Sequence, residues 1–179
     1  KRLTKRTPVG ALQIAGYRTL CNVGSTTYYL EWFEPLLRGC GGRWFNDKGM
    51  SALTEPEAIR AMDLWRDMVA KHKVDDPHYA LSFIEDFPQG RAASQLLGPF
   101  YVPIVNAINP DFELGVAPQP IVDGGRRVTH MYAWSYVTSA KAPKARQAAA
   151  WTFAAWMTTA QNEQWWDKLG FLQPTRRWL

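Results

Sequence analysis

The sequence predicts an α/β fold, because segments with helical periodicity alternate with short runs typical of strands. The clearest helix is "TEPEAIRAMDLWRDMVAKHK", residues 54–73. Its apolar residues recur on one helical face and predict a buried stripe: Ile59, Met62, Trp65 and Val69. An Ala-rich helix is predicted over 142–160, and strands over 11–23 and 91–97. The 179 residues suffice for one domain, in which we expect a mixed sheet flanked by helices.

The first strand, residues 11–23, is interrupted at Gly16. A helix follows within "GSTTYYLEWFEPLLRGCGG", with N-cap candidates at 25–27 and an end at Gly39–Gly42. Pro35 lies inside this run and predicts either a kink or two shorter helices, because proline removes one helical hydrogen bond. In the helix over 54–73, Thr54 and Glu57 predict a capping box, with Pro56 in the first turn.

The second half is predicted from turn residues and periodicity. We expect a short helix over 79–90, a strand over 91–97 and a helix over 100–108 that starts at Gly98-Pro99 and is disturbed by Pro103. A turn and strand follow over 109–121, then a tight turn at "VDGG" and a strand-like run over 126–139. Helices over 142–160 and 161–170 complete the pattern.

Composition argues against several functional classes. The net charge is +5, but no tract of five to eight Lys or Arg exists, so no nucleic-acid partner is predicted. No apolar run approaches the ~20 residues of a membrane span. Three His and two Cys lack metal-ligand spacing, so we expect no metal and no cofactor. Cys21 and Cys40 are either a disulfide or two separate buried thiols.

No arrangement of residues indicates an enzyme. Glu85 and Asp86 are adjacent carboxylates, and adjacent residues on a helix point apart. The sequence contains no GxSxG and no GxxxxGK motif. Two carboxylates distant in sequence can flank a glycosidic bond, so a glycoside-acting enzyme stays as the alternative. A lobe that only contacts other proteins is a third class.

The motifs, taken in order, resemble a known family. They are "WFEPLLRGCGG", "PEAIRAMDLWRDMV", "FPQGRAA", "GPF", "NPDFELGVAPQP", "KARQAAAWTFAAWM" and "LGFLQPTRR". This order is similar to that of the family 1 extracellular solute-binding proteins, the receptors of sugar ABC importers. The resemblance implies one lobe of a two-lobe, type II periplasmic-binding-protein fold. Residues 1–130 would form the second, C-terminal lobe, and 131–179 the hinge-crossing strand and returning helices, with the N-terminal lobe absent.

The resemblance also implies which residues face the ligand. The turn Gly98-Pro99-Phe100 matches one that carries a sugar-stacking aromatic, and the other candidates are Thr27, Tyr28, Tyr132, Ala133, Trp134 and Arg176. Physically, a ring suits the C–H face of a sugar, and the free N–H groups of a helix start suit its hydroxyls. The alternative for Phe100 and Trp134 is a place in the core, and Arg176 can equally be an exposed terminal residue.

The function implied is capture of a sugar or polyol and its delivery to an ABC importer permease. We expect the mature protein in the periplasm or at the cell surface, although no signal peptide is present. The chain begins at Lys1 without Met, so we expect it to be part of a longer protein. A missing lobe would leave apolar surface near 131–179, so self-association is expected.

Overall fold

The computed structural model describes residues 2–19, 26–79, 82, 84–129, 131 and 133–170, with the backbone alone for 26–31. The chain divides into two compact units, each considered by itself. Unit 1 comprises Lys1–Leu97 and Val105–His130, and unit 2 comprises Gly98–Ile104 and Met131–Leu179. The assignment of residues 1–130 and 131–179 to parts of a lobe stays a prediction.

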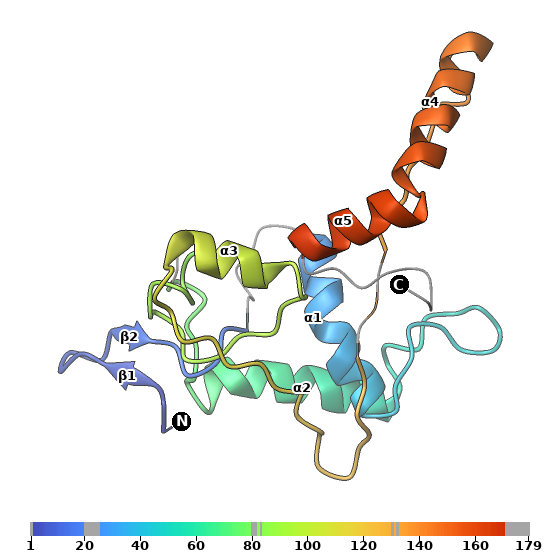
Figure 1. The fold of residues 1–179 in the computed structure, drawn as a ribbon. Helices are drawn as coiled ribbons and strands as arrows, with labels where there is room; N and C mark the ends of the chain where they lie inside the picture. Colours follow the sequence, from blue (N-terminus) through green and yellow to red (C-terminus); the bar gives the residue numbers. More distant parts are fainter. Residues whose placement is uncertain are drawn as a thin grey trace. The chain divides into compact units, whose positions relative to one another are not determined.

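Helices make up most of the regular secondary structure of the described residues, as Figure 1 shows. Two short strands, β1 (Lys5–Arg6) and β2 (Leu12–Ile14), precede the helices. The helices are α1 (Thr26–Gly39), α2 (Pro56–Ala70), α3 (Tyr101–Ile108), α4 (Lys144–Met157) and α5 (Ala160–Gly170). All but one of the predicted helices are therefore confirmed, with ends shifted by a few residues.

Helix α1 is a single helix that contains Pro35, so the prediction of two shorter pieces is wrong. The side chain of Pro35 is fully buried, and this packing offsets the hydrogen bond that proline cannot make. The predicted glycine end is confirmed. Gly41 adopts a positive φ of 89°, and the Gly42 N–H donates to the Leu37 carbonyl at 2.8 Å, which closes the last turn.

Helix α2 begins one residue later than its capping box predicts. Its N-cap is Glu55, which makes no side-chain capping bond, so the prediction of a Thr54–Glu57 capping box is wrong. The Glu55 N–H donates to the Ala52 carbonyl at 3.1 Å, which continues the preceding turn into the cap. Pro56 occupies the first turn as expected, because its missing N–H would have no helical partner there.

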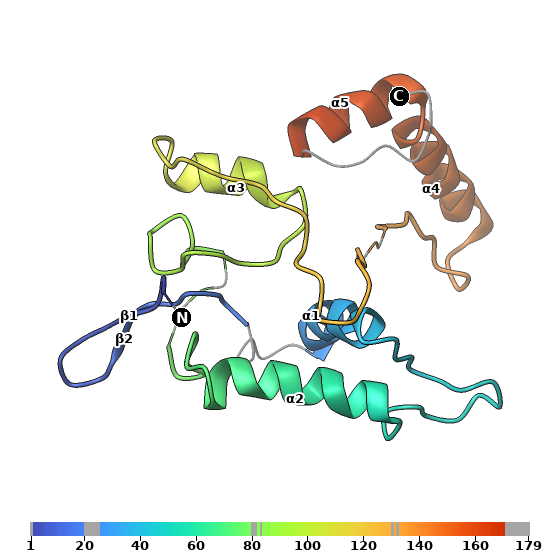
Figure 2. The same cartoon turned by 90° about the horizontal axis from the view of Figure 1, so that it is seen from below.

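Helices α1 and α2 cross at a steep angle, as Figures 1 and 2 show. They pack against each other and supply the buried residues of the larger core cluster. Ala58 and Ala61 of α2 are buried, whereas Ile59 and Met62 are 50% and 49% exposed. The predicted buried stripe is therefore wrong for these two residues. Ala58 and Ala61 each precede one of these exposed residues by one position in the sequence. Their small side chains let α1 approach closely, and together with Trp65 they form the packing face of α2.

Aromatic rings fill the space between these helices. Phe33 stacks on Trp65, with ring centroids 5.7 Å apart and planes at 22°, and meets Trp44 edge-on at 5.6 Å. The Trp44 indole N–H donates to the carboxylate of Glu34 on α1. The Trp65 indole N–H lies 3.4 Å from the Thr19 carbonyl oxygen. Each indole is thus partly buried while its N–H finds an acceptor, as Trp at a core requires.

Backbone pairing in unit 1 is mixed but sparse. β1 pairs antiparallel with β2, and beyond β2 the chain forms isolated parallel bridges, Ala15 with Ala92 and Arg18 with Gln95. The predicted strand over 91–97 is thus present only as bridges. Within the described residues, the predicted strands over 109–121 and 126–139 and the helix over 79–90 are not formed. Val116 and Val137 are over 80% exposed, so apolar alternation there has no packed face to support a strand.

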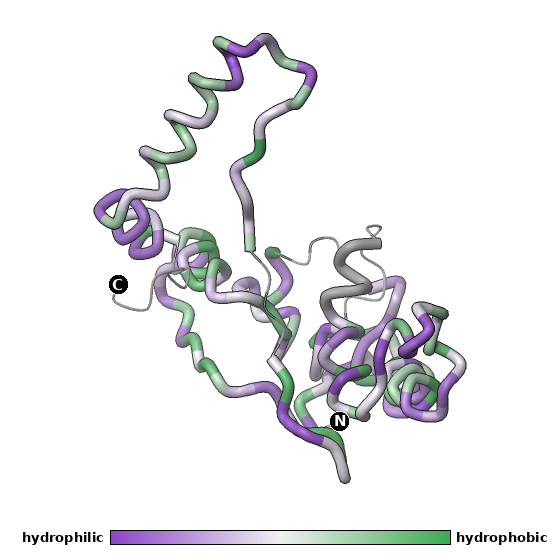
Figure 3. The backbone as a smooth tube through the Cα atoms, turned by 90° about the vertical axis from the view of Figure 1, so that its right-hand side faces the viewer, coloured by the Kyte–Doolittle hydropathy of each residue, from purple (hydrophilic) through white to green (hydrophobic). Residues whose placement is uncertain are grey.

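In unit 2, α4 is the Ala-rich helix and α5 follows it after a short turn. In Figure 3 the tube is purple at the start of α4, where Lys144, Arg146 and Gln147 lie, and mostly pale green to white along the rest of the helix. Only Ala154 of α4 is buried. None of the helices in the described ranges combines the length and hydropathy needed to cross a membrane.

Candidate functional site

The candidate site centres on the turn Gly98-Pro99-Phe100, which opens α3. The Tyr101 N–H donates to the Gly98 carbonyl, and the Val102 N–H to the Pro99 carbonyl, each at 3.1 Å. Pro99 is exposed, whereas Tyr101 is buried at 6% exposure. The predicted helix start is therefore formed as the sequence indicates, with a proline that loses no useful hydrogen bond.

Gly98 permits a close approach of its neighbour's ring. A Cβ atom at Gly98 would lie 2.9 Å from both Cδ1 and Cε1 of Phe100, so the ring folds back over the glycine backbone. Phe100 is half-buried. A partly exposed ring lying against a bare turn presents one apolar surface and nearby backbone polar groups, the combination that sugar recognition uses.

The chain that leads to this turn is firmly held within unit 1. The Trp32 indole N–H of α1 donates to the Leu96 carbonyl at 2.8 Å. The Ser94 hydroxyl donates to the Gly16 carbonyl at 2.8 Å, and the Arg18 N–H donates to the Ser94 carbonyl at 2.9 Å. Residues 94–96 are thus fixed from two sides just before Gly98 in the sequence.

The remaining predicted site residues have different outcomes. Ala133 and Trp134 belong to unit 2, as does the turn at 98–100, and Trp134 is 86% exposed. The core alternative for Trp134 is therefore wrong, and a ligand-facing role stays a prediction. Thr27 and Tyr28 lie in the first turn of α1, where the backbone alone is described. Tyr132 and Arg176 lie outside the described residues.

A buried ionic cluster is the feature that sequence reasoning missed. Arg18, Asp75 and Asp86 have side chains exposed by no more than 1%. A guanidinium N–H of Arg18 donates to the Asp75 carboxylate, and Arg18 Nε lies 3.4 Å from Asp86 Oδ2. Asp75 also accepts from the Thr19 N–H at 2.7 Å and the Thr19 hydroxyl at 2.8 Å.

Two further side chains border this cluster. The Arg18 guanidinium lies over the Tyr79 ring, 5.8 Å from its centroid, and Arg91 lies 3.9 Å from Asp86 Oδ1. Burial raises the pKa of Asp86 above its usual 3.8, although Arg18 and Arg91 act in the opposite direction. The cluster connects three segments, residues 15–19, 74–79 and 86–91, because each supplies at least one of its charged or aromatic groups.

No local pattern could have revealed this cluster, because Arg18 and Asp75 are 57 residues apart. The sequence does show Glu85 beside Asp86, and the expectation that adjacent carboxylates point apart agrees with the exposed Glu85 and the buried Asp86. Both buried aspartates are fully enclosed, so this pair cannot flank a glycosidic bond in solvent.

The structure also bears on metals and thiols. Among the described residues, no group of three or more His, Cys, Asp and Glu is placed to hold a metal ion. Cys40 is a free thiol at the end of α1, and burial raises its pKa, although Arg60 acts to lower it. Cys21 lies outside the described residues, so of the two alternatives for the cysteines the buried free thiol is found at Cys40.

Comparison with known proteins decides the family. The family model for "Bacterial extracellular solute-binding protein" matches residues 22–164, well over half of the chain. The chain belongs to this family. The resemblance inferred from the ordered motifs is therefore confirmed. No curated protein matches the chain.

Two solved structures show the same fold. One is an ABC transporter solute-binding protein from Thermotoga lettingae bound with α-D-tagatose, at 22% identity and a TM-score of 0.70. The other is maltose-bound MalE3 of T. maritima, at 23% identity and a TM-score of 0.66. Our chain is covered over 91% and 83% of its length, respectively. The predicted fold class, part of an α/β solute-binding-protein lobe, is confirmed.

The chain spans only 41% and 39% of the length of these two structures. The family consists of extracellular solute-binding proteins, so its established role is binding. The ligand, the partner and the location of this particular protein are matters for proposal.

Proposed function

We propose that this chain is part of a receptor that captures a sugar or polyol outside the cytoplasm and delivers it to an ABC importer permease. The observation that carries the proposal is the family match over residues 22–164, together with the fold shared with two sugar-bound structures. The half-buried ring of Phe100 over Gly98 supplies a chemically suitable contact within that fold.

The binding chemistry follows from the turn. The C–H face of a sugar ring packs on the exposed side of Phe100, and its hydroxyls meet polar groups of the neighbouring backbone. Ala133 and Trp134 are further candidates, since they belong to the same compact unit as the turn. Trp134 offers a largely exposed ring that a ligand can cover.

The proposed mechanism is closure of two lobes around the ligand, after which the permease recognises the closed receptor. The present chain supplies part of one lobe. We therefore expect the 179-residue chain alone to bind sugars weakly or not at all, because half of the cleft is contributed elsewhere.

A calorimetric titration tests the proposal, using the receptor that contains this chain with maltose and tagatose as the first probes. Binding that releases no product, with a Kd in the micromolar range or below, supports a receptor. Hydrolysis of a chromogenic glycoside would instead support an enzyme. Failure to bind any sugar in a wider thermal-shift screen, combined with binding to a permease, would indicate a lobe used only for protein contact.

The isolated chain provides the matched comparison. Micromolar sugar binding by the 179 residues alone would contradict the two-lobe mechanism, but it would still support a sugar as the ligand. The two halves of the proposal, ligand class and closure, are therefore tested separately.

A further inference from the structure

The buried ionic cluster of unit 1 contains one guanidinium between two carboxylates. Arg18, Asp75 and Asp86 are all enclosed, with side-chain exposures of 1%, 0% and 0%. If both aspartates are ionised, these three groups together carry one uncompensated negative charge in the interior. A charge without a buried partner is costly, and a protein commonly avoids the cost by taking up a proton.

The two aspartates are not equivalent, because their hydrogen bonds differ. Asp75 accepts from a guanidinium N–H of Arg18 and from both the N–H and the hydroxyl of Thr19. Each of these bonds stabilises the ionised carboxylate. Neither oxygen of Asp86 accepts a hydrogen bond from any described residue, and its contacts are ion pairs at 3.4 and 3.9 Å. The geometry therefore favours Asp75 as the permanent anion.

We propose that Asp86 is the proton-binding member of this cluster, so that a fall in pH neutralises Asp86 and leaves the ion pair between Arg18 and Asp75 in place. The proton comes from solvent and binds one carboxylate oxygen, and no other bond changes. The cluster of Arg18, Asp75 and Asp86 then contains one neutral carboxyl and one ion pair, with no excess charge among these three groups.

The charges around Asp86 agree with this assignment. The groups that act on it electrostatically are two cations and two anions, namely Arg18, Arg91, Asp75 and Glu85. Asp86 in turn acts on the nearby phenol of Tyr79. Burial has the largest influence and raises the pKa of Asp86, and the two cations do not offset it. Arg91 is 41% exposed at its side chain, so solvent weakens its attraction.

Asp86 lies where a turn joins a backbone-paired segment, so its protonation state can affect the stability of unit 1. Its backbone carbonyl accepts from the Arg91 N–H at 2.8 Å, and this closes the turn that ends at Gly90, where φ is 75°. The Arg91 carbonyl then accepts from the Ala15 N–H at 2.9 Å. The charge of Asp86 is thus located where the turn over 84–90 leads into residues 92–95, which pair with residues 15–18.

The sign of the pH dependence follows from linkage. A carboxyl whose pKa is raised by folding stabilises the protein below its unfolded pKa, and that stability is lost as the pH rises through the folded pKa. Relative to a variant that cannot ionise at position 86, the protein should gain stability as the pH falls from neutrality through the titration of Asp86.

The experiment compares the protein with Asp86→Asn, and uses Glu85→Gln, at the exposed neighbouring carboxylate, as the control. Thermal unfolding midpoints are measured from pH 7 down to the acid limit of solubility. We expect the unfolding midpoint of the protein minus that of Asp86→Asn to increase as the pH falls, whereas the midpoint of Glu85→Gln should follow that of the protein. If this signed difference is constant, or decreases as the pH falls, the proposal is wrong.

A second measurement keeps the test decisive if Asp86→Asn does not fold. Aspartate labelled with ¹³C at the side-chain carboxyl gives one resonance per residue, and the Asp86 resonance is followed during a pH titration of the unmodified protein. A midpoint above 3.8, the usual value for this group, supports the proposal. A midpoint at or below that value shows that Asp86 stays ionised, and the proposal is then wrong.

Discussion

Replacing Asp75 with Asn should destabilise unit 1 strongly, because Asp75 is the best-bonded member of the buried cluster. Its carboxylate accepts from Arg18 and twice from Thr19, at 2.7 and 2.8 Å in the latter two cases. Asn keeps one acceptor oxygen for Thr19, but its NH₂ group cannot accept from Arg18. Removing one partner of a buried ion pair costs about 3–5 kcal/mol, and Arg18 keeps Asp86, so we expect about 3 kcal/mol.

The assay is urea unfolding followed by tryptophan fluorescence, since Trp32, Trp44 and Trp65 all lie in unit 1. With a slope of about 1–3 kcal/mol/M, a loss of about 3 kcal/mol lowers the urea midpoint by roughly 1–3 M. The control is Asp63→Asn, which removes the exposed pair between Asp63 and Arg66 at 2.7 Å. Exposed pairs contribute about 0–1 kcal/mol. If Asp75→Asn costs no more than this control, the cluster does not stabilise the fold as argued.

Three other predictions concern the turn, a close contact and association. Phe100→Ala should weaken sugar binding by the receptor by roughly 1–3 kcal/mol and largely spare the fold; a stability loss of about 3–5 kcal/mol with unchanged affinity would assign Phe100 to the core. Gly125→Ala should cost about 1–3 kcal/mol, because the new Cβ would clash with the Gly39 carbonyl oxygen. The control Gly115→Ala, with nothing within 4 Å of its Cβ position, should leave the free energy of unfolding unchanged. The isolated chain should self-associate in sedimentation experiments as its concentration rises, and a monomer at high concentration would contradict this.

Local sequence patterns were sufficient to predict α1 and α2, although they also predicted a helix over 79–90 that is not formed within the described residues. Periodicity, a first-turn Pro56 and the glycines after α1 predicted α1 and α2 to within a few residues. These features act within one or two turns of the chain, so a single sequence contains them. The exact packing face of α2 was not contained in the pattern, because Ala58 and Ala61 are buried by the approach of α1 and not by their own hydrophobicity.

The strands and the ionic cluster depend on partners distant in sequence. Residues 91–97 form only bridges, and whether a segment becomes a strand depends on the neighbour with which it pairs. Arg18 and Asp75 are likewise joined across 57 residues, and nothing near either residue in the sequence indicates the other. The turn at Gly98 was predicted because its proline and glycine act locally, whereas its ligand role was inferred from the family resemblance.

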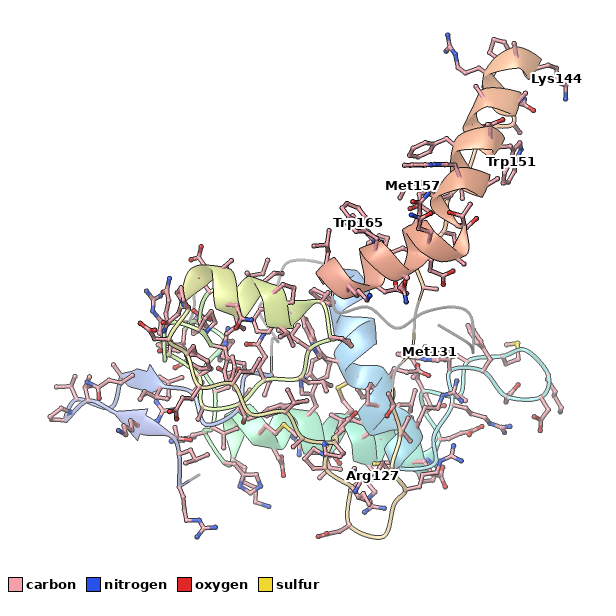
Figure 4. All side chains as sticks on the ribbon, viewed as in Figure 1. Arg127, Met131, Lys144, Trp151, Met157 and Trp165 are labelled. Carbon is pink, nitrogen blue, oxygen red and sulfur yellow. The ribbon has the colours of Figure 1, made fainter. Side chains whose placement is uncertain are left out.

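The tryptophans of the two units differ in their exposure to solvent. In unit 1, Trp32 is 8% exposed, and the Trp44 and Trp65 rings pack on Phe33. In unit 2, five indoles are about half exposed or more, and Figure 4 shows Trp151 and Trp165 projecting from α4 and α5: Trp134, Trp151, Trp156, Trp165 and Trp166. The α4 and α5 indoles are therefore not enclosed within unit 2 by itself.

These exposed rings still form ordered contacts within unit 2. Phe153 lies 6.2 Å from Tyr136 in a T-shaped pair and 6.1 Å from Trp156, so aromatic packing extends from the 131–139 segment onto α4. Rings arranged in this way need only one further apolar surface to become buried. Because the chain spans 41% and 39% of the two sugar-bound structures, the remaining part of a longer receptor is the expected source of that surface. Adding that part should protect the α4 and α5 indoles from an aqueous fluorescence quencher such as iodide, and unchanged quenching would show that these rings face solvent in the complete receptor as well.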